Sequence, residues 1–398
     1  MRRAAIVSPV RTPVGKFLGA LKGVPVETLA ATVVKAVLAR THLDPALIED
    51  VVFAQSYANG ETPCIGRWAA LSAGLPIEVP GMQLDRRCGG GLQAIATAAM
   101  MVETGVCDVV LAGGVESMSN VEFYTTAMRG GSRSGSVALY DRLERGRERS
   151  QPVARFGVIS GMVETAENVA RDCGVTREAA DAYAAESQAR AAAAWRQGRF
   201  DAEIVAVEVP GKGGATTAFV RDEGVREDTT VETLAALKPM IKGGVCTAGN
   251  SSQQNDAASA CLIVAEDRLE ALGLEPMGFL VGWAAAGCHP ATMGLGPVPA
   301  VERLLRKTGL SFADLGLVEL NEAFAAQVLG VVQHWDALDP AILNVNGSGI
   351  SLGHPIGATG VRILTTLMYE MHRRGVRYGL ETMCVGGGQG VAAIFERA

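Results

Sequence analysis

Residues 88–114 read CGGGLQAIATAAMMVETGVCDVVLAGG, in which three glycines lead an alanine-rich stretch that ends in an apolar run and two further glycines. This order predicts a helix that starts at the glycines and a buried strand that follows it. A similar order occurs near the C-terminus, where GATGVRILTTLM at 357–368 precedes ETMCVGGG at 381–388. The repetition indicates two related halves. If they face one another, Cys88 and the C-terminal motifs lie at a shared centre.

Strands and helices alternate along most of the chain. Apolar runs bounded by glycine predict strands at 4–7, 50–53, 108–112, 261–265, 278–286, 317–320 and 382–385, and alanine-rich stretches predict helices at 27–40, 90–103, 177–198, 299–307, 322–334 and 357–374. This alternation indicates an α/β protein with largely buried sheets.

The composition limits the class of protein. A chain of 398 residues exceeds one compact domain, and 48% hydrophobic with 20% charged residues is typical of a soluble globular protein. The net charge of −6 argues against a nucleic-acid partner. No apolar run approaches the roughly 20 residues that span a bilayer, so we expect no membrane partner. Residues 1–17 lack the apolar region of a secretory signal, so we expect the protein in the cytoplasm.

Residues 119–247 interrupt the alternation and are interpreted as a loop domain inserted into the first half. The predicted division is therefore 1–118 with 248–272 for the N-terminal half, 119–247 for the insertion, and 273–398 for the C-terminal half. Within the insertion, two interpretations of the arginines stay open: a solvated face, or a cationic rim for a phosphorylated ligand. These arginines are Arg133, Arg142, Arg145, Arg147 and Arg149.

The eight cysteines show neither a CxxC motif nor zinc-ligand spacing, so we expect no metal, and in a reducing compartment no disulfide. Cys88 differs from the others because it stands directly before a predicted helix. Unpaired N–H groups and the positive end of the helix dipole favour a thiolate there, and thiolates attack thioesters. Cys88 is therefore a candidate nucleophile.

Two further residues stand in glycine-rich text near the C-terminus. His354 lies in NGSGISLGHPIGATG at 346–360, a context that suggests an imidazole held on a rigid turn. Such an imidazole can deprotonate a thiol or donate to an oxyanion. Cys384 precedes VGGGQG and suits a proton shuttle or, less well in the cytoplasm, a disulfide.

Together these motifs resemble the thiolase family, and the resemblance extends along essentially the whole chain. Its other motifs are VRTPVGKF at 10–17, GGVESMS at 113–119, TAEN at 165–168, LKP at 237–239, TAGNSS at 247–252, MGLGPVP at 293–299 and NEAFA at 321–325. The resemblance implies a five-layered αβαβα fold built from two similar halves, with the inserted loop domain over the site. It also implies a homodimer or homotetramer.

The resemblance implies a role for each residue that matches a catalytic motif. Cys88 corresponds to the nucleophile that is acylated, and Cys384 to the acid/base that exchanges the α-proton of the second acyl-CoA. His354 corresponds to the activator of Cys88 and to one donor to the thioester oxygen. Asn321 corresponds to the residue that holds a water as the other donor. The N–H groups of Cys88 and Gly386 correspond to a second oxyanion hole.

The implied substrates are acyl-CoA thioesters, with no cofactor bound permanently. Ser252 matches a residue that contacts the pantetheine arm of coenzyme A, and Ala248 and Phe324 match residues that line the same tunnel. Arg226 matches an arginine near the adenine nucleotide, and Met162 belongs to the acyl-binding region. The implied reaction is reversible thiolysis of a 3-ketoacyl-CoA, as in fatty-acid β-oxidation, or Claisen condensation of acetyl-CoA with an acyl-CoA.

The chain departs from the biosynthetic members of the family at three places. Gln253 and Gln254 follow Ser252 where glycine and an aliphatic residue are common, Gly161 stands where histidine is common, and His289 replaces a common aspartate before a proline. We therefore expect an acyl preference that differs from that of short-chain biosynthetic thiolases.

The sequence disfavours three alternative functions. A ketoacyl-synthase-like condensing enzyme pairs one cysteine with two histidines, and here Asn321 stands where one of those histidines is expected. A non-catalytic acyl-CoA-binding protein on the same fold would tolerate loss of Cys88, His354 or Cys384, and all three are present. A Rossmann dehydrogenase is disfavoured because no GxGxxG follows the first strand.

Overall fold

The computed structural model describes residues 2–159, 161–211 and 214–398. Its centre is one hydrogen-bonded ten-stranded sheet in the order β12-β13-β14-β11-β1-β10-β5-β3-β4, with β2 paired to β10. The strands are β1 (Ala4–Arg11), β2 (Gly15–Lys16), β3 (Asp50–Ala54), β4 (Met82–Leu84), β5 (Val109–Ser117), β10 (Asn255–Ala265), β11 (Gly278–Gly287), β12 (Leu317–Leu320), β13 (Tyr378–Val385) and β14 (Gln389–Arg397).

The two halves of this sheet repeat one topology. In the N-terminal half β3 runs parallel to β5, which pairs antiparallel with β10, which pairs antiparallel with β1. In the C-terminal half β12, β13, β14 and β11 follow the same sequence of parallel and antiparallel pairings. The halves join where Ala5 pairs with Phe279 and Ile6 with Gly278. The duplication inferred from the two glycine-led helices is thus visible in the strand order.

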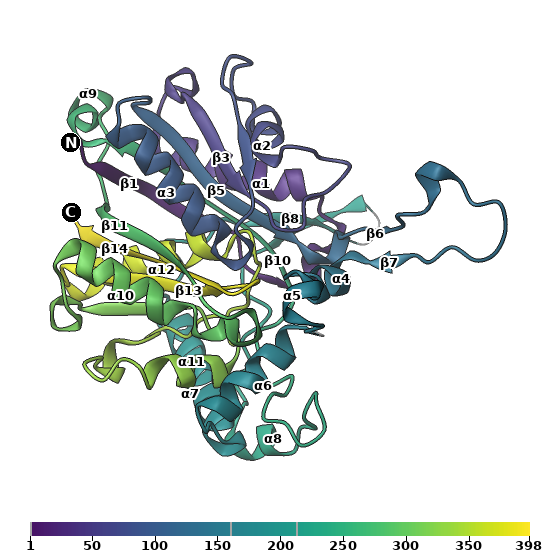
Figure 1. Ribbon diagram of the computed structural model, residues 1–398. Helices are drawn as coiled ribbons and strands as arrows, with labels where there is room; N and C mark the ends of the chain where they lie inside the picture. Colours follow the sequence, from purple (N-terminus) through teal and green to yellow (C-terminus); the bar gives the residue numbers. More distant parts are fainter. Residues whose placement is uncertain (1, 160, 212–213) are drawn as a thin grey trace.

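Helices complete five layers (Figure 1). Helices α1 (Val26–Thr41) and α2 (Ile65–Ala73) cover the outer face of the N-terminal half. Helices α10 (Pro297–Thr308) and α11 (Ala325–Val332) cover that of the C-terminal half. Helices α3 (Gly90–Glu103) and α12 (Thr359–Arg374) lie in the middle, where one apolar core contains residues from both halves of the sheet. The predicted αβαβα fold is confirmed.

The first turns of α3 and α12 touch backbone to backbone. A Cβ on Gly360 would lie 2.0 Å from the amide nitrogen of Leu92, and one on Gly91 would lie 2.9 Å from that of Gly360. Close by, a Cβ on Gly114 would lie 2.0 Å from the carbonyl oxygen of Gly357. Only glycine allows these approaches. The contact brings the loop that carries Cys88 against the loop that carries His354.

Several expected elements differ at their ends. The helix expected at 322–334 begins at Ala325, because Phe324 is extended (φ −148°, ψ 145°) and pairs with Ser251. The expectation was wrong for this first turn, whose extended backbone leaves Asn321 at the end of β12. Strand β14 was not predicted, because its sequence directly follows three glycines, which are typical of a loop.

The segment 119–247 lies along one side of the molecule and contributes no strand to the ten-stranded sheet in its described part (Figure 1). An extended arm between two short strands projects from the body. The elements of the segment are β6 (Phe123–Tyr124), β7 (Tyr140–Asp141), α4 (Arg142–Glu148), α5 (Val153–Phe156), α6 (Met162–Asp172), α7 (Arg177–Arg196), β8 (Val207–Pro210), β9 (Thr216–Phe219) and α8 (Val231–Ala235).

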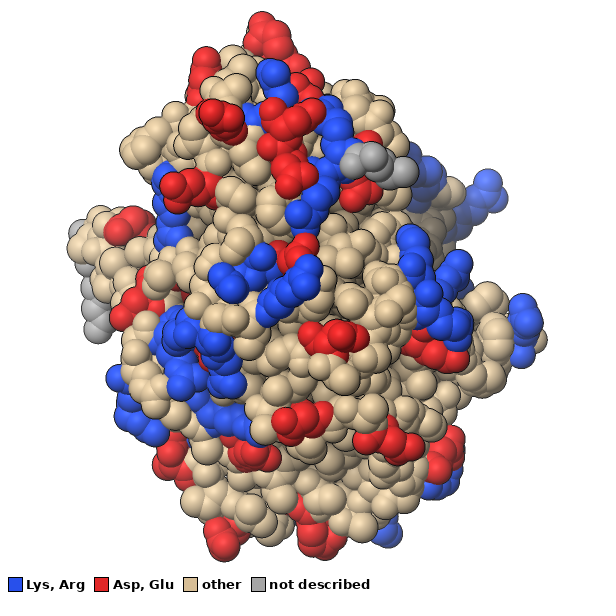
Figure 2. Space-filling view, turned by 90° about the vertical axis from the view of Figure 1, so that its left-hand side faces the viewer, with Lys and Arg blue, Asp and Glu red and all other residues tan. Residues whose placement is uncertain are grey.

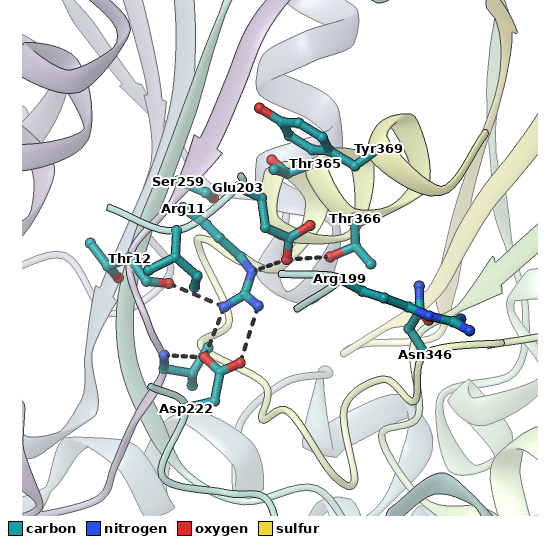
Figure 3. A network of polar contacts seen from close by, with 12 residues as sticks. Arg11, Thr12, Arg199, Glu203, Asp222, Ser259, Asn346, Thr365, Thr366 and Tyr369 are labelled. Carbon is teal, nitrogen blue, oxygen red and sulfur yellow. Dashed lines mark hydrogen bonds and ion pairs between the residues drawn. The ribbon is translucent and has the colours of Figure 1, made fainter. Parts of the chain in front are cut away.

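A buried ion-pair network ties this segment to both halves (Figure 3). The Arg11 guanidinium in β1 donates to Glu203 (2.6 Å) and to both carboxylate oxygens of Asp222 (2.8 and 3.1 Å). Glu203 also accepts a hydrogen bond from Thr366 of α12 (3.0 Å). Breaking such a buried pair typically costs about 3–5 kcal/mol, because a charge is left unpaired. The network therefore fixes the position of the segment that covers the site.

Basic and acidic side chains are mixed over the face shown in Figure 2, where basic groups have acidic ones beside them. Ion pairs that involve exposed side chains include those of Arg2 with Asp267 (2.8 Å) and of Arg377 with Glu396 (2.8 Å). None of the described helices has the length and apolar character needed to cross a membrane.

We predict that Gly360→Ala destabilises the protein, because the added methyl group forces α12 away from α3. The expected loss in the free energy of unfolding is about 1–3 kcal/mol or more, measured by urea denaturation. Gly130→Ala is the matched control, since a Cβ there would meet nothing within 4 Å. Equal stability of the two variants would contradict the proposed contact.

Candidate active site

A cavity of about 580 Å³ opens between the two halves and the segment 119–247. Eight of the ten residues selected from the sequence line it: Cys88, Met162, Arg226, Ala248, Ser252, Phe324, His354 and Gly386. The other two are buried immediately behind its wall. Asn321 places its amide nitrogen 3.5 Å from both ring nitrogens of His354, and Cys384 packs in the apolar cluster that contains Met293 and Phe324.

Cys88 occupies a short 3₁₀ turn, η3 (Arg87–Gly89), immediately before α3. Arg87 adopts the left-handed conformation (φ 47°), and its N–H donates to Asp85 (2.6 Å). A positive φ at a non-glycine residue is a strained conformation that the surroundings must hold. Gly89 follows in contact with β14, where a Cβ would lie 2.6 Å from Val391. These contacts hold the turn in place, with Cys88 in the lining of the cavity.

Burial controls the protonation of Cys88. It raises the pKa of the thiol to about 11, although the N–H groups of Gly386 and of Cys88 itself hydrogen-bond the sulfur and lower the pKa. The helix start was expected to favour the thiolate. That prediction is wrong for the protein without substrate, because burial raises the pKa of Cys88 by more than the local N–H groups lower it. Cys88 is a thiol at neutral pH and needs a base.

His354 is held in a form that can supply that base. Its backbone N–H donates to Asn255 (2.8 Å), and its Nδ1 lies 2.7 Å from the Thr359 hydroxyl oxygen. That hydroxyl donates to the Pro355 carbonyl (2.9 Å). Since a carbonyl can only accept, the hydroxyl proton is used there, and Nδ1 must be the donor to Thr359. Nε2 is then left with a lone pair.

The charge state of His354 agrees with this tautomer. Burial, together with the positive charges of Arg362 and Arg147, lowers the pKa of the imidazole to about 3. The ring is therefore neutral at physiological pH. A neutral imidazole with a free Nε2 accepts a proton from a thiol and afterwards donates it.

Two buried carboxylates that were not selected from the sequence anchor the loop around His354. Glu116, at the end of β5, accepts from the Gly357 N–H (3.0 Å). Glu322 accepts from the N–H groups of Ser348 and Ile350 (3.2 Å each). The sequence offered one signal for them, because each acidic residue lies in a segment that is otherwise mainly apolar or small. A carboxylate buried in such a segment needs hydrogen-bond donors around it.

Comparisons with known proteins identify the family of the chain. The thiolase N-terminal domain model matches residues 4–267, and the thiolase C-terminal domain model matches residues 274–397.

The chain belongs to the thiolase family.

Its relatives cover the whole molecule. The acetyl-CoA acetyltransferase of Pseudomonas aeruginosa is 44% identical over 401 residues, with 100% of both chains covered. The beta-ketoadipyl-CoA thiolase of Escherichia coli is 43% identical, also with 100% of both covered. Among solved structures, the Bacillus anthracis acetyl-CoA acetyltransferase superimposes with a TM-score of 0.96 at 40% identity, covering 100% of this chain and 99% of that one. Human mitochondrial 3-ketoacyl-CoA thiolase gives 0.94 at 37%, with the same coverage. This thiolase is therefore an acyltransferase.

Cys384 ends β13 beside the first thiol of this thiolase. It is fully buried, and burial followed by the neighbouring Cys88 raises its pKa well above the ordinary value. A buried protonated thiol next to the nucleophile is a proton donor to a carbanion formed there. Cys384 can return to this form only if the substrate supplies the proton it gives up.

The departures seen in the sequence fall at different places. Gly161, Gln253 and Gln254 line the cavity. His289 instead accepts from the Ala291 N–H (3.2 Å) at the start of a 3₁₀ helix, η8 (Pro290–Leu295). The first three therefore bear on what the cavity binds.

We predict a pH dependence for the alkylation of Cys88. Because its pKa of about 11 lies above the working range, the thiolate fraction rises about tenfold per pH unit. Iodoacetamide labelling of the Cys88 peptide, followed by mass spectrometry between about pH 7 and pH 9, should therefore accelerate without a plateau. The exposed Cys64 is an internal reference. A plateau below pH 8 would show a resting thiolate–imidazolium pair. It would contradict the assignment of Cys88 and His354 as a neutral thiol and a neutral imidazole.

Thr359→Val should lower kcat for thiolysis of acetoacetyl-CoA about tenfold, since one buried hydrogen bond contributes roughly 1–2 kcal/mol. KM should change little, because Thr359 acts through His354 and lies outside the cavity lining. Thr359→Ser keeps the hydroxyl and is expected to retain most of kcat. If serine and valine lower kcat equally, the hydroxyl does not orient the imidazole.

Proposed function

We propose that this thiolase cleaves 3-ketoacyl-CoA with coenzyme A, or condenses acetyl-CoA with an acyl-CoA in reverse, through an acyl group on Cys88. The observation that carries the proposal is the placement of two buried thiols and a neutral imidazole at one end of the cavity. A nucleophile that becomes acylated cannot also act as the base. A second acid/base group is therefore required beside the nucleophile, and the buried Cys384 thiol suits that role.

In thiolysis, His354 takes the proton of Cys88, and the sulfur attacks the 3-keto carbon. The Cys88 and Gly386 N–H groups donate to the tetrahedral oxyanion. The bond between carbons 2 and 3 then breaks, and its electron pair forms the enolate of acetyl-CoA. His354, now carrying the proton on Nε2, donates to the enolate oxygen together with a water held by Asn321. Loss of one such donor typically lowers the rate about 10²–10³-fold.

Cys384 completes the turnover by giving its proton to carbon 2, which releases acetyl-CoA. Coenzyme A then enters, and the Cys384 thiolate takes the proton of its thiol. The new thiolate attacks the acyl group on Cys88, and the Cys88 sulfur leaves with the proton from His354. Both cysteines and the imidazole return to their starting states.

The other end of the cavity fits the body of coenzyme A. Ser252, Ala248 and Phe324 line its wall, and Arg226 and Met240 of the segment 119–247 line the same cavity. The half-exposed apolar side chain of Met240 and the guanidinium of Arg226 suit an adenine ring and a phosphate respectively. We assign Met162 to the acyl-binding region beside them.

We further propose a cytoplasmic homodimer or homotetramer that binds no permanent cofactor and serves fatty-acid metabolism such as β-oxidation. The eight unpaired cysteines fit a reducing compartment. Strand β4 ends the sheet with an open edge, and Trp68, Leu71 and Ile77 are exposed nearby. Such edges pair readily with a second chain.

Cys88→Ala and Cys384→Ala test the mechanism in a panel of thiolysis and condensation assays. We expect both variants to lose more than about 10³-fold in kcat, since each removes a covalent or proton-transfer step. Cys384→Ala should still form the acyl-enzyme, whereas Cys88→Ala should not. Cys107→Ala, a buried cysteine outside the cavity, is the control and should keep its activity. Acyl-enzyme formation by Cys88→Ala would refute the assignment.

A further inference from the structure

Arg147 carries a positive charge into the reactive end of the cavity. It belongs to α4 in the Arg-rich part of the segment 119–247, and it lines the cavity together with Cys88 and His354. Its charge adds to the effect of burial in lowering the pKa of His354, and it opposes the rise that burial causes in the pKa of Tyr57. The guanidinium therefore lies close to the reacting groups.

In the described part of the chain, the side chain that hydrogen-bonds the Arg147 guanidinium is uncharged. The amide of Gln254, oriented with its oxygen toward the guanidinium, accepts from both terminal nitrogens (3.1 and 3.0 Å), but this partner is neutral. Within the described chain no carboxylate forms an ion pair with Arg147 within 4.0 Å, although Glu144 and Glu164 line the same cavity. Arg87, the other arginine at this end, lies 3.9 Å from Asp85.

Of the five arginines at 133, 142, 145, 147 and 149, Arg147 is the one that lines the cavity in the described part of the chain. Two of the others contact different side chains. Arg142 pairs with Glu122 (2.9 Å), and Arg145 lies over the ring of Tyr140 (3.7 Å). The cationic rim that the sequence suggested is thus reduced to one inward-facing guanidinium.

Helix α4 holds Arg147 in place before any ligand binds. Leu143 is buried against Tyr57 and Met118, and the Tyr57 hydroxyl donates to the Leu143 carbonyl (3.1 Å). Asp141 caps the helix by accepting from the Leu143 N–H (2.8 Å). A cation fixed on a packed helix needs little reorganisation to bind an anion.

The phosphates of coenzyme A do not explain this charge. In the proposed binding mode the phosphates lie at Arg226, whereas Arg147 lines the cavity with Cys88 and His354 and its charge acts on the His354 imidazole. Met118 and Ile356 line the cavity with Arg147 and pack against the cluster formed with Tyr57 and Leu143, so apolar side chains accompany the guanidinium. An acyl chain with an apolar middle and an anionic end matches this arrangement.

We propose that Arg147 binds a carboxylate at the distal end of the acyl chain, so that the preferred substrates are 3-oxo-dicarboxylyl-CoA thioesters. The inference rests on the proposed thiolase function of the same site. Arginine and carboxylate form charge-assisted, often bidentate hydrogen bonds. Gln254 then orients the guanidinium, which gives a physical role to a departure noted in the sequence.

The test compares kcat/KM for thiolysis of 3-oxoadipyl-CoA and 3-oxohexanoyl-CoA, which have equal chain length but end in a carboxylate and a methyl group. We expect the wild type to prefer the carboxylate about 10- to 100-fold. Arg147→Met should abolish this ratio, and Arg147→Lys should keep part of it. Arg149→Met, an exposed arginine of the same segment outside the cavity, is the matched control and should keep the ratio.

The outcomes separate this inference from the proposed function. Cleavage of both substrates without a preference, or a preference that survives Arg147→Met, would overturn the role of Arg147 and leave the thiolase function intact. Cleavage of neither substrate, nor of acetoacetyl-CoA, would overturn the proposed function. Thermal unfolding of each variant shows whether a lost ratio reflects the binding site or a failure to fold.

Discussion

The backbone contact between the first turns of α3 and α12 determines the rest of the site. Each helix follows a reactive loop, and each can approach the other only because Gly91 and Gly360 lack side chains. The approach brings the loop that carries Cys88 against the loop that carries His354, and both residues line one cavity. Buried anchors then fix the loops: Glu116 and Glu322 accept N–H groups from the His354 loop, and the Arg11 network holds the covering segment.

Burial is the second constraint, and it sets the protonation states on which the chemistry depends. The same loss of water raises the pKa of Cys88 and Cys384 and lowers that of His354. All three groups are therefore neutral in the resting enzyme. The proton moves from the Cys88 thiol to the His354 imidazole only as the sulfur attacks, so that the negative charge passes to the substrate oxygen. Positive side chains nearby, including Arg147, reinforce the neutral imidazole.

Much of this arrangement follows from local sequence physics. Glycine-led helices, buried strands and the position of Cys88 before α3 are predictable because close backbone approach requires glycine and buried strands require apolar runs. The net pKa of Cys88 was not, because the helix start and desolvation act in opposite directions and only the fold gives their balance. Similarly, the arginines of residues 130–151 look alike in sequence, and only the packing of α4 directs Arg147 inward. The unwound turn at Asn321 also depends on its tertiary contact with Ser251.

The central claim is that Cys88, rather than Cys384, carries the acyl group at a centre built by the two halves. Mass spectrometry of the protein after brief incubation with acetyl-CoA, followed by digestion, tests this claim directly. We expect one acetyl group per chain, on the peptide that contains Cys88, and its removal by added coenzyme A. Acetylation of Cys384, or none on Cys88 in an enzyme that cleaves acetoacetyl-CoA, would contradict it.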